Sequence, residues 1–300
     1  MISSKERVRA AVGRRHVDRI PRGELVIDEE LIRRSFKRDR IGFEEKAAFI
    51  KELRLDLVTL APAYPAGPDV PVRLESPLPD LEKWTSRTPL FTFALLDGPF
   101  GWGTRTQGYI EFLVAFSRSS FRSCGAFIEK VEQLNCGLIT DLVDRGVDGI
   151  IIADDLAYQR GLMVNPETLR EIYFPSLARQ LEAAGEEVPL FFHSDGDYSL
   201  IIPDLIDCGF AGLQCFEKTA GMDPLKLKAL YPELCFWGTL EVEDLQRAHK
   251  SAYLERLLFE IGTLSQEGGF ILGTTCGLFQ GIDLEGLKAV YSQLDDSSTG

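Results

Sequence analysis

Short apolar runs recur along the chain, and each has the length and the Gly or Pro flanks of a buried parallel strand. Stretches with a helical spacing of apolar positions separate most of these runs. Alternating strands and helices predict a parallel sheet, and eight of them predict a closed (β/α)8 TIM barrel, an α/β fold. The eight predicted strands are Glu24–Ile27, Leu57–Leu60, Phe91–Leu96, Gly149–Ala153, Leu190–Phe192, Gly212–Cys215, Cys235–Trp237 and Phe270–Thr274.

Start and stop signals bound the predicted helices. Ser3-x-x-Glu6 is a capping box that opens a short helix to about Gly13. Asn165-Pro166 is typical of an N-cap followed by proline at the first helical position. The longer predicted helices are Glu44–Leu53, Ala126–Arg145, Pro166–Ala184, Ser199–Cys208, Pro224–Leu230 and Ala252–Glu267.

Two regions interrupt this alternation. The segment from Pro62 to Pro89 is rich in proline and predicts an irregular excursion, and Leu113 to Arg122 predicts a helix or helix pair. We expect one TIM-barrel domain over residues 1–300, with a helical extension over 1–20 and a frayed tail over 295–300.

Composition and charge narrow the possible functions. A formal net charge of −13 and the lack of a basic cluster beyond Arg14-Arg15 and Arg33-Arg34 argue against nucleic-acid binding. No apolar run reaches the roughly 18 residues of a membrane span, and the charged start predicts no signal peptide. The six cysteines are irregularly spaced, as expected of reduced thiols in a cytoplasmic protein.

Residues that can bind a metal follow three different predicted strands. His193, Glu217 and Cys276 each come directly after an apolar run, and Asp195 lies two positions beyond His193. The carboxyl ends of parallel strands converge, so these four residues are a candidate tetrahedral zinc set. Carboxylates are weaker partners than cysteines for a zinc ion that activates a thiolate. A hydrogen-bonded polar cluster with an inert Cys276 explains the spacing equally well.

Further candidates follow the third and fourth runs. Asp154 and Asp155 end a wholly apolar strand, and alternation should point one of them into the barrel mouth as a substrate-orienting or acid/base group. The alternative is that one caps a helix and the other is solvated. Asp97 and Gly98 open a turn signature, and Phe100, Trp102 and Tyr109 are able either to stack on a flat ligand or to pack in the core.

The same residues carry a resemblance that spans nearly the whole chain. The order of short motifs resembles the uroporphyrinogen decarboxylase superfamily, whose members share a (β/α)8 barrel. Individually the motifs are weak, and their shared order is the signal. They are Lys5 to Ala11 with Val17 to Pro21, Asp97-Gly-Pro-Phe100, Asp154-Asp155 with Phe174-Pro175, His193-Ser-Asp-Gly196 with Ile202-Pro-Asp204, Ala220-Gly-Met-Asp-Pro224, Trp237-Gly238, and Gly268 to Gly273.

Three positions depart from the decarboxylases of that superfamily. The matching places read Arg22-Gly-Glu-Leu, Leu60-Ala-Pro62 and Thr275-Cys-Gly277, without the arginines, the aspartate and the histidine of the decarboxylase motifs. A chain of charge −13 without those arginines would bind the eight carboxylates of uroporphyrinogen poorly. Decarboxylase activity is therefore the disfavoured alternative.

The resemblance is closer to the methyltransferase branch, whose members work with methylcobamide or a corrinoid protein and bind zinc through His-x-Cys and a distant Cys. It implies zinc at His193, Asp195, Glu217 and Cys276, with Asp195 standing where a cysteine is expected. The candidate catalytic residues are Asp97, Asp154 and Asp155, and the candidate cofactor contacts are Gly98, Phe100, Trp102 and Gly238.

The expected activity is methyl transfer between a small substrate and a methylcobamide, with a separate corrinoid protein as partner. None of the histidines lies in the Asp-x-His-x-x-Gly motif of corrinoid carriers. A homodimer is left open. The alternatives are an unusual porphyrinogen decarboxylase and a non-catalytic tetrapyrrole- or corrinoid-binding protein.

Overall fold

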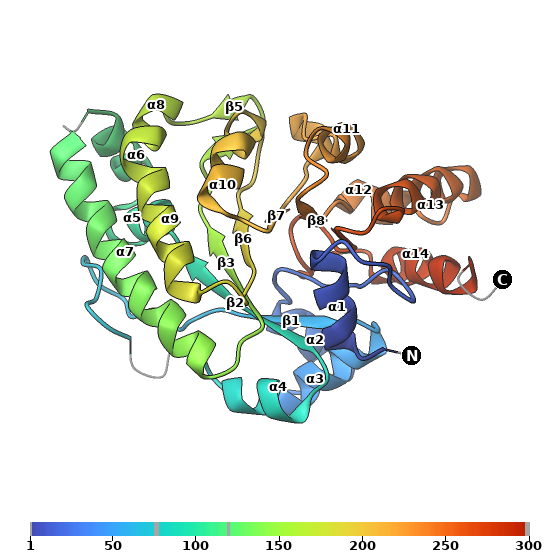
Figure 1. Cartoon of the computed structure of the whole chain (residues 1–300). Helices are drawn as coiled ribbons and strands as arrows, with labels where there is room; N and C mark the ends of the chain where they lie inside the picture. The colour runs from blue at the N-terminus through green and yellow to red at the C-terminus, as the bar shows by residue number, and fades with distance from the viewer. Residues whose placement is uncertain (1, 75–77, 119–120, 298–300) are drawn as a thin grey trace. The chain divides into compact units, whose positions relative to one another are not determined.

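The computed structural model describes residues 2–74, 78–118 and 121–297. The chain divides into two compact units, which are described separately. The first unit comprises Met1–Thr59, Lys83–Phe91 and Asp223–Gly300, and the second comprises Leu60–Glu82 and Thr92–Met222. Figure 1 colours the chain from blue at the N-terminus to red at the C-terminus.

The second unit is built on four parallel strands in the order β2-β3-β6-β7. These strands are fully or almost fully buried along their middle residues, as expected of a parallel sheet covered on both faces. All four coincide with predicted strands to within one residue. Their bounds are Phe91–Asp97, Gly149–Ala153, Leu190–His193 and Gly212–Gln214.

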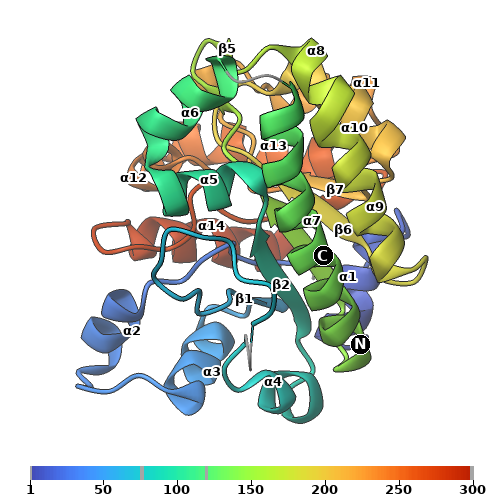
Figure 2. The same ribbon diagram turned by 90° about the vertical axis from the view of Figure 1, so that its left-hand side faces the viewer.

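Helices follow the first three strands of the second unit. Figures 1 and 2 show α7 and α9 running side by side next to this sheet, and Figure 2 shows α5 and α6 beyond the end of β2. A short hairpin that the sequence did not predict, β4–β5, follows β3. The bounds are Pro99–Gln107 for α5, Tyr109–Arg118 for α6, Phe121–Asp144 for α7, Ala157–Tyr158 for β4, Gly161–Leu162 for β5, Pro166–Thr168 for α8, Phe174–Ala184 for α9 and Ile202–Cys208 for α10.

The predicted helix Pro166–Ala184 forms with one irregularity. A π-helical turn at Leu169–Tyr173 joins α8 to α9. The predicted Pro-rich excursion contains little regular structure until α4, Leu81–Arg87. Residues 75–77 of that excursion and residues 119–120 of the predicted helix pair lie outside the described residues.

The first unit contains β1 (Leu57–Leu60), β8 (Cys235–Trp237) and β9 (Phe270–Ile271), with β8 and β9 parallel. The predicted strand Glu24–Ile27 is wrong. This segment makes only isolated parallel bridges, from Arg22 to Leu272 and from Ile27 to Leu278. The physical reason lies at Glu24, whose buried carboxylate takes the backbone N–H of Thr274 in place of a backbone carbonyl.

The helices of the first unit include three that the sequence did not predict, α2, α12 and α14. The predicted capping box of α1 is confirmed, and α13 and α14 lie side by side (Figure 1). The predicted frayed tail begins too early, because α14 continues to Ser297 and Asp295 pairs with Arg22 and Arg54. The bounds are Ser4–Val12 for α1, Glu29–Phe36 for α2, Phe43–Glu52 for α3, Pro224–Leu230 for α11, Val242–Arg247 for α12, Ser251–Ser265 for α13 and Leu284–Ser297 for α14.

Within the described ranges, no helix combines the length and apolar character needed to cross a membrane.

Candidate functional site

The carboxyl edge of the second unit's sheet gathers polar side chains. Strand register sets Asp97 level with Ala153, Ala153 level with His193, and His193 level with Gln214. Residues just beyond this line therefore meet at one end of the sheet, where α/β enzymes place their chemistry.

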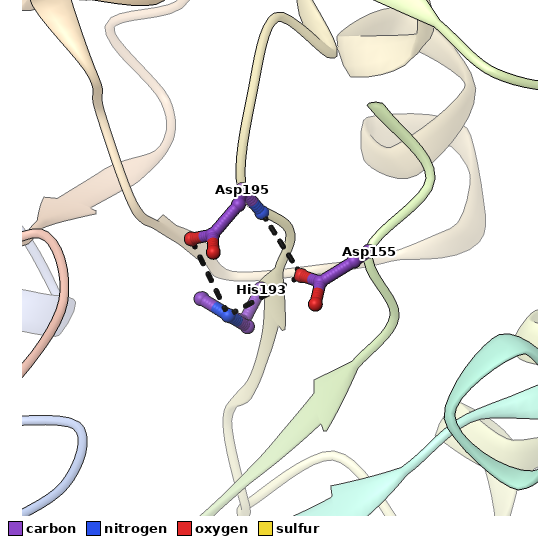
Figure 3. A group of neighbouring side chains, drawn as sticks. All are labelled: Asp155, His193 and Asp195. Atoms are coloured by element: carbon purple, nitrogen blue, oxygen red, sulfur yellow. Dashed lines mark hydrogen bonds and ion pairs between the residues drawn. The ribbon is translucent and has the colours of Figure 1, made fainter. Parts of the chain in front are cut away.

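His193 lies between two carboxylates at this edge (Figure 3). Its Nε2 is 3.7 Å from Asp155 Oδ1 and 3.9 Å from Asp195 Oδ1. Its Nδ1 lies against Oε1 of the buried Gln214. An amide oxygen only accepts hydrogen bonds, so in the neutral ring Nδ1 carries the proton and Nε2 presents a lone pair to the two carboxylates.

Asp195 belongs to two groups of possible metal ligands. One group is Asp155, His193 and Asp195, and the other is Asp195, Cys215 and Glu217; within each, the ligand atoms lie within 4.8 Å of one another. The Asp195 pKa is raised by burial, and the nearby His193 opposes that rise. Asp195 is thus the shared member of a site that extends across β6 and β7.

Backbone hydrogen bonds hold the loop that carries Asp195. The Asp195 N–H donates to Asp155 Oδ1 at 3.1 Å, and the Gly196 N–H donates to Glu217 Oε2 at 2.8 Å. Gly196 has φ of 79°, and a Cβ there would come 2.5 Å from the backbone N of Tyr158 in the β4–β5 hairpin. Only glycine fits this position, so the loop geometry is fixed by packing as well as by hydrogen bonds.

The donor set fits a divalent cation such as zinc. Nitrogen and oxygen ligands of a tetrahedral zinc ion lie about 3.3–3.5 Å apart, given bond lengths of about 2.0–2.2 Å. The separations of 3.7 and 3.9 Å at His193 exceed a direct hydrogen bond and come close to that value. A cation would also relieve the apposition of an imidazole lone pair with two carboxylates, and Gln214 would hold the ring in the ligating tautomer.

Asp97 and Asp154 lie at this same edge of the sheet, and both have partners. Burial raises the Asp97 pKa, while Arg105, whose Nη2 is 2.6 Å from Asp97 Oδ2, lowers it. The Arg105 guanidinium stacks 4.7 Å from the centre of the Tyr64 ring. Asp154 is 1% exposed and accepts from Tyr173 Oη at 2.7 Å and from the Gly101 N–H at 2.8 Å.

The profile of the family described as uroporphyrinogen decarboxylase (URO-D) matches residues 98–296. The chain belongs to the uroporphyrinogen decarboxylase family. This membership confirms the resemblance that the order of motifs indicated.

Comparison with solved structures supports the fold of this URO-D family chain. A methyltransferase from Methanosarcina mazei superimposes with a TM-score of 0.72 over 99% of both chains, at 16% sequence identity. At that identity the likeness shows the fold alone, and it confirms the predicted α/β fold of the TIM-barrel class. A structure described as QR15, an aldolase, has a TM-score of 0.42 at 8% identity over 87% of this chain and 92% of its own. No curated protein matches the chain.

Two aromatic residues expected to contact a cofactor are instead core residues in this URO-D chain. Phe100 is 3% exposed and packs edge-on against Phe112 and Tyr173, and Trp102 is 1% exposed. Neither presents a ring face to a flat ligand, so the core-packing alternative describes both. Gly98 has a comparable structural role, since a Cβ there would come 2.2 Å from Asp154 Oδ2.

The remaining candidates, Cys276 and Gly238, belong to the first unit. Cys276 is exposed beyond β9, with Sγ 3.6 Å from the Gly277 carbonyl oxygen, and Gly238 follows β8 with φ of 80°. Their expected roles beside His193 stay predictions. Among the predicted metal ligands, Asp195 lies close to His193 in one group of possible ligands and close to Glu217 in the other.

Sequence reasoning missed Gln214 and Cys215. Cys215 is 1% exposed, yet its Sγ lies in the second group of possible ligands. A signal was present in the spacing, because Cys215-x-Glu217 at the end of β7 repeats the His193-x-Asp195 pattern at the end of β6. Residues two apart in an extended segment share a face.

Proposed function

We propose that this URO-D family protein is a metal-assisted methyltransferase that moves a methyl group between a small substrate and a corrinoid carried by a separate protein. The observation that carries the proposal is the pair of carboxylates facing His193 Nε2, with Nδ1 fixed by Gln214. The Methanosarcina methyltransferase, which has the same fold, supports the same reaction class.

His193 and Asp195 would hold the metal, and Asp155, Glu217 or Cys215 would complete its ligands. A bound zinc ion supplies Lewis-acid activation of the atom that gives or takes the methyl group. Asp155, whose side chain is 57% exposed, would contact a substrate that enters from solvent. Asp97, paired with Arg105, would orient substrate rather than exchange a proton.

The ligand types indicate which atom is methylated or demethylated. Carboxylates are harder ligands than thiolates and leave more positive charge on the metal. Such a metal polarises an oxygen or nitrogen centre better than it keeps a bound thiolate nucleophilic. We therefore propose a substrate with an oxygen- or nitrogen-bound methyl group.

The residues expected to contact a corrin ring fit that role less well than the residues around His193 fit a metal ion. Phe100 and Trp102 are buried, and the space beside Gly98 is filled by Asp154. None of the three offers a stacking surface, so we assign no corrin contact to them. The corrinoid would be presented by its carrier protein.

Elemental analysis of the purified protein, combined with substitution at His193 and Asp195, tests the proposal. We expect about one zinc per chain, its loss in His193→Ala, and at least about a 100-fold fall in methyl transfer from an oxygen- or nitrogen-methyl substrate to cob(I)alamin in the same variant. His249→Ala, an exposed histidine of the first unit, is the matched control and should change neither quantity.

Variants of Asp195 separate the proposal from its competitors. Asp195→Cys should raise zinc affinity and weaken turnover of an oxygen- or nitrogen-methyl substrate. If Asp195→Asn leaves the metal content at zero and any activity unchanged, Asp195 only hydrogen-bonds and the metal proposal fails. Cobalamin binding without metal would instead indicate a non-catalytic binding protein.

The family's name favours a second candidate, decarboxylation of uroporphyrinogen. Arg22, which falls at the matching arginine motif, is 2% exposed, and its Nη1 and Nη2 both donate to Asp295, so this pair of donors is not open to bidentate binding of a substrate carboxylate. Incubation with uroporphyrinogen followed by product chromatography decides this candidate, and we expect no decarboxylated product.

A further inference from the structure

A cavity of about 710 Å³ lies within the first unit, apart from the residues of the proposed site. Its walls come from the loop that follows α1, from the last turn of α13 and from the end of α14. Gly268, one of its lining residues, precedes β9, whereas Cys276 follows the other end of that strand. The cavity therefore lies at the amino end of β9. An inference about its ligand does not rest on the proposed function.

The cavity has more positive than negative charge left unpaired. The exposed side chains of Arg14, Arg15 and His16 line it and make no hydrogen bond or ion pair with other residues in the described ranges. Two lining carboxylates are already neutralised, Asp18 by Arg7 and Asp295 by Arg22 and Arg54, which leaves Glu267. Two guanidinium groups are thus available to an anion, against one carboxylate.

A buried donor points to the same conclusion. Arg22 lines the cavity and is 2% exposed. Its Nη2 donates to Asp295 and to the Tyr291 carbonyl, but its Nε has no partner among the described residues. Buried donors are normally satisfied, and one without a partner marks a place where a ligand or water can supply the acceptor.

The basic loop is held in place before any ligand binds. Arg14 has a left-handed backbone with φ of 55°, and its N–H and that of Arg15 donate to the carbonyls of Ala11 and Ala10. A Cβ on Gly268, where φ is 71°, would come 2.9 Å from the Arg14 carbonyl carbon. Close backbone packing thus fixes the loop, and a fixed site loses less entropy on binding.

We propose that this cavity binds a small polyanion carrying two or more phosphate or carboxylate groups. Arginine forks pair with both kinds of group through two parallel hydrogen bonds. The volume falls in the range of small-molecule sites, about 300–1,000 Å³. The net charge of −13 opposes binding of a long nucleic acid, so the occupant is a small molecule.

Isothermal titration calorimetry of the full chain with inorganic pyrophosphate and with citrate, at constant ionic strength, tests the proposal. We expect saturable binding of one molecule per chain for at least one of the two anions. The anion that binds more tightly identifies phosphate or carboxylate as the preferred group. The double variant Arg14→Ala/Arg15→Ala should weaken binding at least about tenfold, because two charge-assisted contacts are removed.

The matched control removes the same charge elsewhere in the first unit. Arg38 and Arg40 are exposed and do not line the cavity, so Arg38→Ala/Arg40→Ala should bind as the wild type does. A third variant, Arg14→Lys/Arg15→Lys, keeps the charge and should recover part of the affinity. No saturable binding of either anion, or equal weakening in the two alanine double variants, would overturn the proposal.

Discussion

Asp154 and Asp155 are neighbours in the sequence, and the structure gives them opposite environments. Asp154 is 1% exposed, and its two carboxylate oxygens accept from Tyr173 and Gly101. Asp155 has a side chain that is 57% exposed and faces His193 Nε2 at 3.7 Å. One carboxylate completes a hydrogen-bond network, and the other joins a group of like charges around an imidazole.

The difference separates a carboxylate with a structural role from one that the proposed function would use. A buried polar group with every partner in place holds neighbouring elements together, and here Asp154 caps the first turn of α5, whose N-cap residue Gly98 has no side chain. Asp155 and Asp195 instead share a single imidazole and one backbone N–H, so their like charges are offset only in part, and a bound cation would offset them further. The two residues should therefore respond differently to the same substitution.

The largest effect is expected from Asp154→Ala. The change leaves the Tyr173 hydroxyl and the Gly101 N–H without acceptors in a buried site and vacates the carboxylate's volume. We expect a loss of about 3–5 kcal/mol in the free energy of unfolding. Denaturant titration followed by circular dichroism measures it.

Asp155→Ala is the matched control for that substitution. Its side chain is mostly exposed and accepts one hydrogen bond, from the Asp195 N–H, so the free energy of unfolding should fall by no more than about 1.5 kcal/mol while affinity for the proposed metal falls. Equal destabilisation by the two alanine variants would contradict the division into a structural and a functional carboxylate.

Glu24 extends the comparison to a buried carboxylate in the first unit. Burial raises its pKa to about 7 from the ordinary 4.5, although hydrogen bonds from Thr274 and Tyr291 oppose the rise. The folded protein therefore holds this proton more tightly than the unfolded chain does. The contribution of this proton to the free energy of unfolding is fully present below about pH 4.5 and is lost as the pH rises through about 7.

Glu24→Gln should remove this pH dependence, because glutamine stays neutral. The difference in unfolding free energy between wild type and variant should shift by roughly 3 kcal/mol between pH 4.5 and pH 8, in favour of the variant at high pH. Urea titrations across that range measure the shift. Parallel pH profiles for the two proteins would show that Glu24 does not titrate in this way.

The strands of this fold were largely predictable because buried parallel strands are continuous apolar runs. Gly149–Ala153 and Cys235–Trp237 were predicted with the observed bounds. The Glu24–Ile27 prediction failed because a buried carboxylate hydrogen-bonds the neighbouring backbone there, which periodicity cannot detect. Helix α5 was missed because Gly98-Pro99 was interpreted as a turn, although proline at the first helical position is equally a helix start.

The site was predictable only in part. The positions of His193, Asp195 and Glu217 after successive strands were enough to predict that they converge. The sequence did not distinguish Asp154 from Asp155, since alternation predicts opposite directions without saying which residue is enclosed. Gln214 was missed because its contribution is a hydrogen bond to the far side of the His193 ring, and this depends on the register of two strands.

Gln214 gives the smallest and most specific expected effect. Its side-chain oxygen fixes the His193 tautomer, so Gln214→Leu should lower zinc affinity about 10–100-fold while leaving the ligating atoms in place. Gln214→Glu is the matched variant, because it keeps an acceptor at Nδ1 and should retain most of the affinity. Competition with a chromophoric chelator measures zinc affinity, and circular dichroism confirms folding, which matters because Gln214 is fully buried.

If the leucine and glutamate variants at this position bind zinc equally well, Gln214 does not orient His193. The orientation of the His193 Nε2 lone pair toward Asp155 and Asp195 would then need another explanation. The second ligand group, which contains Cys215 and Glu217, would become the stronger candidate for the metal site.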